Sequence, residues 1–281
     1  MIRRGRVYLE SRSEPASAET AKLERQGYAI VRNVLAADEL AALREEVAAI
    51  FERDPPDARG RRGQEDAAMF RYAMLNRCAA AQRAVANPKL LEVIEPPLGE
   101  DCHVIANTAW RNPAGQPGSH GGQSWHIDAG PHVPLPEGVR WPRKLPHPVF
   151  AIGVHLYLQD CRIEDGPTGV IPRSHLSGRA PPADRTFDDD LACEGKGVKP
   201  LLTRAGDAAL FVSDVWHRRM PTQGGDQGRF FLQIHYGRRD IAQRLLPTEQ
   251  ANQLTASAIR RAETDRERRV VGLHPAFFYD G

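Results

Sequence analysis

Short β-prone runs, separated by turns rich in glycine and proline, fill the second half of this sequence. Runs of four to eight residues bounded in this way are typical of strands. The runs are Cys102–Trp110, Val149–Leu158, Gly169–Ile171, Ala208–Val212, Val215–Met220 and Arg229–Tyr236. Many short strands with frequent turns favour a sandwich or a barrel.

The first hundred residues show a helical pattern instead. Helices are predicted at Ala18–Gln26, Ala37–Arg53, Arg77–Ala86 and Lys89–Ile94. In the second of them, apolar side chains recur at the spacing of an amphipathic helix, at Leu40, Leu43, Val47 and Ile50. Such helices need an apolar surface to cover, and a β-sheet would provide it.

The last β-prone run divides its side chains between two faces, because alternate residues of a strand point to opposite sides. One face is apolar and consists of Phe230, Leu232, Ile234 and Tyr236. The other carries Arg229, Phe231, Gln233 and His235. The first face would pack beneath the N-terminal helices and the second would line a site. We predict a mainly β fold, a double-stranded β-helix (jelly roll, cupin-like) with N-terminal helices packed on one sheet.

Length and charge are consistent with one domain over residues 1–281. We expect a flexible tail at 1–14, a helical flank at 15–100, a jelly-roll core at 101–240 and a C-terminal helical extension at 241–281. The net charge of +2 gives no general signal for nucleic acid or membrane binding. The four widely spaced cysteines are predicted to be free thiols in a reducing cytoplasm.

A candidate metal site is formed by His126, Asp128 and His217. The first two stand two residues apart, so on an extended strand both side chains leave the same face. His217 lies in another β-prone run and would complete a set of two imidazoles and one carboxylate, which suits Fe(II) better than structural zinc. Arg229 follows after a turn-rich segment, and a hairpin would return it beside the metal.

A His-x-Asp triplet alone is a weak signal, but an ordered set of motifs surrounds it. The set comprises Trp125-His126-Ile127-Asp128, Asp165–His175, Gly206-Asp207, Phe211, His217 and Arg229. In this order and context the chain resembles the phytanoyl-CoA dioxygenase (PhyH) family of iron- and 2-oxoglutarate-dependent oxygenases, over roughly residues 25 to 240.

The resemblance implies a role for each member of the candidate site. His126, Asp128 and His217 match the family's Fe(II) ligands, and Arg229 matches the residue that pairs with the distal carboxylate of 2-oxoglutarate. The co-substrate and O2 would yield succinate and CO2 while a C–H bond of a small molecule is oxidised, most simply by hydroxylation. Related halogenases carry a small residue in place of the carboxylate, so Asp128 favours hydroxylation. His175 would support a loop and not bind metal.

Further polar residues are weaker candidates. Gln123, Trp125 and His155 are predicted to approach the co-substrate. On the substrate side the candidates are Asn107, Arg111, Tyr157, Arg218 and Arg219, whose arginines hint at an acidic substrate. The turn-rich stretch Leu176–Pro200 is either a solvated surface loop or a lid over the pocket.

Two other functional classes stay open at this point. The chain could be a non-catalytic jelly-roll protein that holds metal only for stability. It could also be a cupin-like metal-dependent hydrolase or isomerase, although that hypothesis leaves Arg229 without a role. Succinate formation would separate the first hypothesis from an oxygenase, and activity without oxygen would favour the second.

Overall fold

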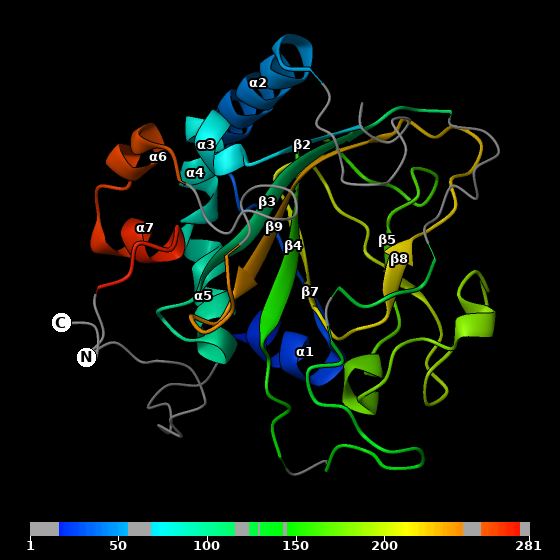
Figure 1. The fold of residues 1–281 in the computed structure, drawn as a ribbon. Coiled ribbons are helices and arrows are strands. Elements are labelled where there is room, and N and C mark those ends of the chain that lie inside the picture. The colour runs from blue at the N-terminus through cyan, green and yellow to red at the C-terminus, as the bar shows by residue number, and fades with distance from the viewer. Residues whose placement is uncertain are drawn as a thin grey trace.

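Two antiparallel sheets form the centre of the computed structural model, which describes residues 17–55, 69–115, 124–128, 130–142, 145–243 and 254–275. The larger sheet has six strands in the order β1-β7-β4-β9-β3-β2, and the smaller has three in the order β6-β5-β8. The strands are β1 Tyr28–Val31, β2 Phe70–Tyr72, β3 His103–Asn112, β4 Ala151–Tyr157, β5 Thr168–Val170, β6 Lys199–Pro200, β7 Ala208–Val212, β8 His217–Arg219 and β9 Arg229–Gly237. Figure 1 shows the small sheet standing beside one side of the large one.

Helices lie along the other side of the large sheet (Figure 1). They are α1 Ala18–Gln26, α2 Ala37–Arg53, α3 Met74–Arg77, α4 Ala79–Val85, α5 Pro88–Leu98, α6 Ala256–Arg261 and α7 Asp265–Val270. Two 3-10 turns, η3 Ser174–Ser177 and η4 Ala183–Arg185, lie instead between β5 and β6 of the small sheet in the chain. The buried apolar side chains of the helices join those of the sheet in one cluster. The jelly roll with a helical layer on one sheet is therefore confirmed.

Local signals explain why several helices begin and end where they do. The Ser17 hydroxyl accepts a hydrogen bond from the Thr20 N–H at the start of α1, and Gly27 ends this helix in the left-handed conformation. The predicted bounds of α1 and α2 agree with the structure. The helix predicted over Arg77–Ala86 is α4, which begins only at Ala79 because Cys78 has an extended backbone; Arg77 is the last residue of the separate helix α3.

Strand β9 divides its faces as its sequence predicts. Ile234 and Tyr236 are fully buried in the cluster beneath the helices, where the Tyr236 hydroxyl donates to the Val85 carbonyl at 2.8 Å. Burying a large apolar side chain stabilises the fold by about 1.5–3 kcal/mol, so this face fixes which side of β9 remains for the site. Two short strands, β2 and β6, were not predicted, and β8 is shorter than its predicted run.

The pairing of β3 with β9 decides which β3 side chains reach the inner side. Trp110 lies opposite Phe231, and Asn112 lies opposite Arg229, on the site-facing side. Arg111 lies opposite Phe230 and therefore on the helix-covered side. A register shift between Val104 and Ala106 precedes these pairs.

His175, in η3, lies against the turn that joins α1 to β1. Its Nε2 donates to the Glu24 carbonyl at 3.1 Å, and the ring lies against Gly27. Gly27 has a φ of 83°, and a Cβ there would come within 2.7 Å of the His175 ring. A side chain larger than hydrogen at residue 27 would therefore displace His175.

We expect this histidine to make stability depend on pH. Burial, and next the neighbouring His147, lowers the pKa of His175 to about 4. As the pH falls below about 6.5, the unfolded chain binds a proton that the folded chain does not, so stability that is complete above pH 6.5 is lost toward pH 4. The loss between pH 7 and pH 5 should be about 2 kcal/mol. Urea unfolding at both pH values should show a smaller loss for His175→Gln, and equal losses would contradict this role.

The four cysteines are free, as predicted. Among the described residues, no helix is long and apolar enough to cross a membrane. The predicted tail at 1–14 lies outside the described residues.

Candidate active site

His126 and His217 are held opposite each other by backbone pairing. The N–H of each residue donates to the carbonyl of the other at 3.0 Å, which makes an isolated bridge between the His126 segment and β8. The Asp128 N–H donates to the Ser213 carbonyl at 3.1 Å. The backbone therefore brings the His-x-Asp triplet and His217 together before any metal binds.

Backbone carbonyls also orient both imidazoles. Nδ1 of His126 donates to the Ser124 carbonyl at 2.7 Å, and Nδ1 of His217 donates to the Val215 carbonyl at 2.9 Å. Since each Nδ1 carries the proton, each Nε2 keeps its lone pair for a ligand. Oδ1 of Asp128 lies 3.4 Å from Nε2 of His217 and 4.0 Å from Nε2 of His126.

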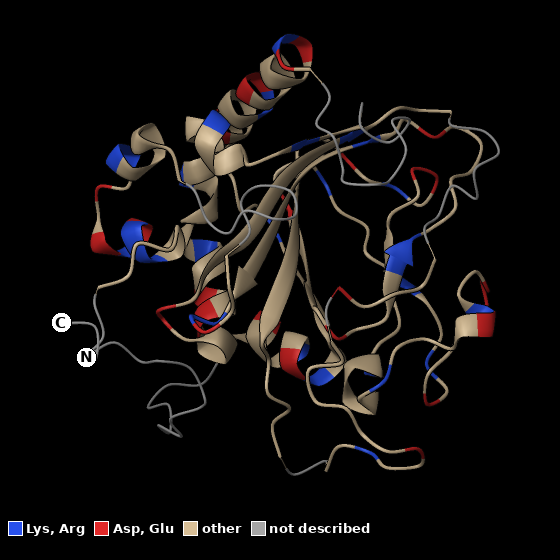
Figure 2. Ribbon diagram, viewed as in Figure 1, with Lys and Arg blue, Asp and Glu red and all other residues tan. Residues whose placement is uncertain are grey.

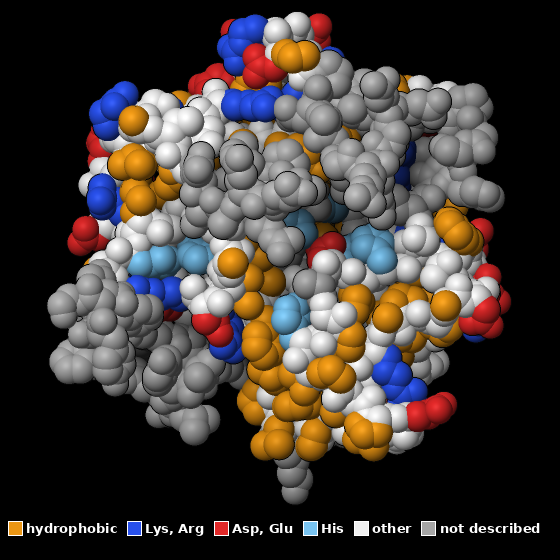
Figure 3. Space-filling model, in the orientation of Figure 1, with side chains coloured by type: hydrophobic (Ala, Val, Ile, Leu, Met, Phe, Trp, Pro, Cys, Tyr) orange, Lys and Arg blue, Asp and Glu red, His pale blue; other side chains and the backbone are white. Residues whose placement is uncertain are grey.

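Together these three residues offer ligand atoms that all lie within 4.8 Å of one another. They are the one such group of histidine, cysteine and acidic side chains within the described part of the chain. Figure 3 shows histidine side chains on both sides of an acidic side chain near the centre of one face. The arrangement can hold a metal ion through two nitrogens and one oxygen.

The charges in this cluster favour an ionised Asp128. Burial opposes ionisation, but the neighbouring imidazoles, His217 first and then His235, outweigh it and hold the pKa of Asp128 well below its usual value. Burial also lowers the pKa of His217, but Asp128 outweighs that effect and leaves the pKa raised. In the absence of metal, Asp128 thus attracts a proton to His217, and a divalent cation would take that proton's place.

Arg229 is a buried cation without an acidic partner. It is 5% exposed, and its Nε and Nη2 donate to Oδ1 of Asn112 at 3.3 and 3.1 Å. Its guanidinium lies over the Phe231 ring. No carboxylate among the described residues pairs with it. Since a buried charge is costly unless it is paired, an anionic ligand would complete this side of the site.

A pocket connects Arg229 to the three candidate ligands. Its lining residues are Trp110, His126, Asp128, His155, Thr168, His217, Arg218, Arg219, Arg229, Phe231 and Gln233. Apart from His126 and Asp128, which lie outside the named strands, they come from both sheets and so line the space between them. Nδ1 of His155 lies 3.0 Å from the Thr168 hydroxyl, and burial, followed by the charge of Arg229, lowers the pKa of His155 well below its usual value. His155 is therefore a neutral polar group beside the cation.

Two of the predicted residues fasten a loop beside the pocket, and one of them, Arg218, also lines the pocket. Trp125 is 2% exposed, does not line the pocket and donates its indole N–H to the Asp188 carbonyl at 2.8 Å. Arg218 stacks on the Trp125 ring and bonds to the Phe187 carbonyl and to the Asp189 carboxylate. These bonds hold part of the predicted loop Leu176–Pro200 against the site.

Three other predicted residues do not line the pocket. Asn107 and Arg111 lie opposite apolar residues of β9 on the helix-covered side and line no part of it. Arg111 stacks on Phe51 and forms an ion pair with Glu52 at 2.6 Å. Tyr157 faces the inner side but stays fully buried behind the lining residues. Gln123 lies outside the described residues.

His235, which the sequence places on the site-lining face of β9 without giving it a role, lies beside the cluster. Nδ1 of His235 lies 3.7 Å from Oδ2 of Asp128. The Trp110 indole donates to Oε1 of Gln233 at 2.6 Å, and Nε2 of Gln233 donates to Nε2 of His235 at 2.8 Å. Because an indole only donates, this chain fixes the amide and leaves the His235 proton on Nδ1, facing Asp128.

The alternation of β9 predicts His235 on the same face as Arg229, and the structure places it there, but the sequence holds no sign of its contact with Asp128. Asn112 and Thr168 were missed. Their roles depend on contacts with other strands, for which the sequence holds no local signal.

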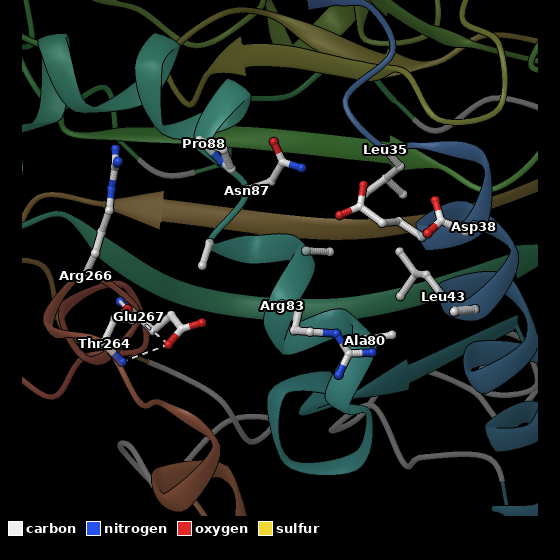
Figure 4. Close-up of a pocket in the computed structure, with 14 residues that line it drawn as sticks. Leu35, Asp38, Leu43, Ala80, Arg83, Asn87, Pro88, Thr264, Arg266 and Glu267 are labelled. Carbon is white, nitrogen blue, oxygen red and sulfur yellow. Dashed lines mark hydrogen bonds between the residues drawn. The ribbon is translucent and has the colours of Figure 1, made fainter.

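A second, larger hollow of about 480 Å³ lies on the helical side, away from the cluster. Figure 4 shows residues from α2, α4 and α7 around it, including Leu43, Arg83 and Glu267. The apolar and charged side chains that line it belong mostly to α2, α4 and α7. Among the described residues, none of those that could hold a metal lines this hollow.

Comparisons with known proteins agree on one family and one fold. The family model for phytanoyl-CoA dioxygenase (PhyH) matches residues 23–226. Among solved structures, the epimerase SnoN in complex with Fe3+, alpha ketoglutarate and nogalamycin RO has a TM-score of 0.60 and 17% identity, covering 85% of this chain and 95% of its own. The carbocyclase SnoK from nogalamycin biosynthesis has a TM-score of 0.58 and 17% identity, covering 82% and 87%.

EctD from S. alaskensis, solved with 2-oxoglutarate and 5-hydroxyectoine, has a TM-score of 0.63 and 18% identity, covering 87% of this chain and 88% of its own. At these identities the likeness is one of fold. A comparison with curated protein sequences gave no match.

Proposed function

Since the chain belongs to the phytanoyl-CoA dioxygenase (PhyH) family, we propose that it is an Fe(II)- and 2-oxoglutarate-dependent oxygenase that hydroxylates a small molecule. The supporting observation is a single pocket that joins two features. One is the cluster of His126, Asp128 and His217, and the other is the buried, unpaired cation Arg229.

The cluster fits Fe(II) by its donor chemistry and by its orientation. Two neutral imidazoles and one carboxylate form the ligand set that non-haem iron oxygenases use, with positions left open for other ligands. The carbonyls of Ser124 and Val215 keep both Nε2 atoms directed at Asp128. Asp128 is ionised without metal present and would bind through Oδ1, the oxygen nearest both imidazoles.

When bound, Fe(II) would supply the position at which 2-oxoglutarate and O2 react to give succinate, CO2 and an oxidised substrate. Arg229 would bind the distal carboxylate of the co-substrate, because its planar guanidinium suits two-point binding in a pocket that excludes water. Asn112 holds Nε and Nη2 of Arg229 and so directs the guanidinium. His155, being neutral, adds no competing charge beside it.

Arg229 also favours an oxygenase over the other two classes. A metal-dependent hydrolase or a protein that holds metal for stability alone has no use for a buried guanidinium within the metal pocket. Such a cation costs free energy in the unliganded fold. An anionic co-substrate accounts for it.

Within the oxygenase class we propose hydroxylation in particular. Asp128 supports it, because related halogenases lack this carboxylate. Structures of similar fold include an epimerase and a carbocyclase. Mass spectrometry of substrate incubated with enzyme, Fe(II) and 2-oxoglutarate distinguishes these outcomes. Hydroxylation adds one oxygen atom, ring formation removes two hydrogens and epimerisation leaves the mass unchanged. A product without added oxygen would overturn the hydroxylase assignment and keep the oxygenase class.

His235 is expected to strengthen iron binding by holding Asp128. Its Nδ1 proton faces Oδ2 of Asp128, which leaves Oδ1 for the metal. Loss of a residue that orients a ligand in this way typically lowers metal affinity by about 10- to 100-fold. We expect His235→Ala to show this loss in an anaerobic Fe(II) titration. His274→Ala serves as a control because His274 pairs with His103 outside the pocket. Equal affinities for the two variants would remove His235 from this role.

A further inference from the structure

A second guanidinium group lines the same pocket as Arg229. Arg219 follows His217 by two residues on β8, so both side chains leave the same face of the strand. Across the small sheet Arg219 pairs with Thr168, which also lines the pocket. In Figure 2 the end of β8 is blue among strands that are mainly tan.

Two donors of Arg219 are buried without a partner among the described residues. Its Nε and Nη2 form no hydrogen bond with any residue that the structure describes. Arg218, the preceding residue, differs because its guanidinium already bonds to Phe187 and Asp189. The two adjacent arginines therefore differ. Arg218 bonds to the loop, whereas the buried donors of Arg219 lack a partner among the described residues.

The charge around Arg219 is also uncompensated. Arg229 repels it, and among the described residues no carboxylate forms an ion pair with either arginine. Asp226 attracts Arg219 but forms no ion pair with it, and its two oxygens accept from the backbone N–H groups of Gly228 and Gly115. Two buried like charges without an anion between them cost free energy, which an anionic ligand would recover.

We propose that Arg219 binds the distal carboxylate of the oxo-acid co-substrate together with Arg229. The inference rests on the proposed function and deepens it. A carboxylate has two oxygens that accept about four hydrogen bonds, so it can serve two guanidinium groups at once. Arg219 is then a co-substrate residue, and the pocket selects oxo acids that carry a second carboxylate.

Calorimetric titration of the Ni(II)-loaded protein tests this assignment, because Ni(II) permits binding without turnover. The two titrants are 2-oxoglutarate and 2-oxopentanoate, which has the same carbon chain but lacks the distal carboxylate. We expect Arg219→Met to weaken 2-oxoglutarate binding by about 10- to 100-fold. Its affinity for 2-oxopentanoate should match that of the wild type. Arg204→Met is the matched control, since Arg204 is an exposed arginine outside the pocket.

Thermal unfolding adds a readout that does not depend on turnover. Without co-substrate, Arg219→Met should unfold at or above the wild-type temperature, because it removes an unpaired buried charge. With 2-oxoglutarate it should gain less stability than the wild type does. Arg219→Gln, which keeps a donor, is the second variant if the first does not fold.

The outcomes separate the two claims. If the wild type binds 2-oxoglutarate, but Arg219→Met binds it unchanged or loses both titrants equally, the role of Arg219 is overturned and the proposed function stands. If the wild type binds neither titrant, the proposed function fails and this inference fails with it.

Discussion

Replacing Asp128 by alanine is expected to abolish Fe(II) binding, with an affinity loss of more than about 100-fold. The variant would retain two imidazoles but no anionic ligand in a pocket that already contains Arg219 and Arg229. A divalent cation would then enter a positively charged pocket with one ligand fewer. Activity should fall with iron content, because every position for co-substrate and oxygen depends on the metal.

Anaerobic Fe(II) titration followed by metal analysis measures this effect. Asp240→Ala is a suitable control, because Asp240 pairs with Arg238 and its side chain is 60% exposed. Both variants should unfold near the wild-type temperature in the absence of metal. Near-normal iron content in Asp128→Ala, with turnover retained, would show that Asp128 is not a ligand.

Replacing Arg229 by methionine is expected to remove 2-oxoglutarate binding while leaving Fe(II) binding intact. Loss of one partner of a buried charge pair costs about 2–5 kcal/mol, which corresponds to a rise in Kd of about 30- to 4000-fold. The change also frees Oδ1 of Asn112, which now accepts both bonds from the guanidinium. The cluster should keep its geometry, because backbone carbonyls of Ser124 and Val215 orient its two imidazoles.

Separate titrations with Fe(II) and with 2-oxoglutarate distinguish this effect from general damage. Arg229→Lys should recover part of the co-substrate affinity, because it restores the charge but not the planar fork. Unchanged affinity in Arg229→Met would assign the distal carboxylate to another residue and leave the buried guanidinium without a function.

Sequence patterns predict the local elements well because the governing forces are local. Alternation in β9 separates the face that packs on the helices from the face that carries Arg229, and both faces lie as expected. The amphipathic spacing in α2 likewise places Leu43 and Val47 in the core. The ordered motifs around His126 and His217 single out residues that the fold does bring together.

The residues that support the site depend on strand register, which the sequence does not specify. Asn107 and Arg111 fall on the helix side because β3 pairs with β9 in a register that turns Thr108, Trp110 and Asn112 inward. A shift by one residue would reverse this assignment. The different surroundings of Arg218 and Arg219 likewise depend on which loop packs beside β8.

The central claim is that His126, Asp128, His217 and Arg229 form one site that couples Fe(II) to 2-oxoglutarate. Succinate release by the purified wild-type protein, measured with and without Fe(II), 2-oxoglutarate and O2, tests it most directly. We expect succinate only when all three are present, and we expect no succinate from Asp128→Ala or from Arg229→Met. Failure of the iron-loaded wild type to form succinate with any substrate supplied, or equal succinate formation by wild type and both variants, would contradict it.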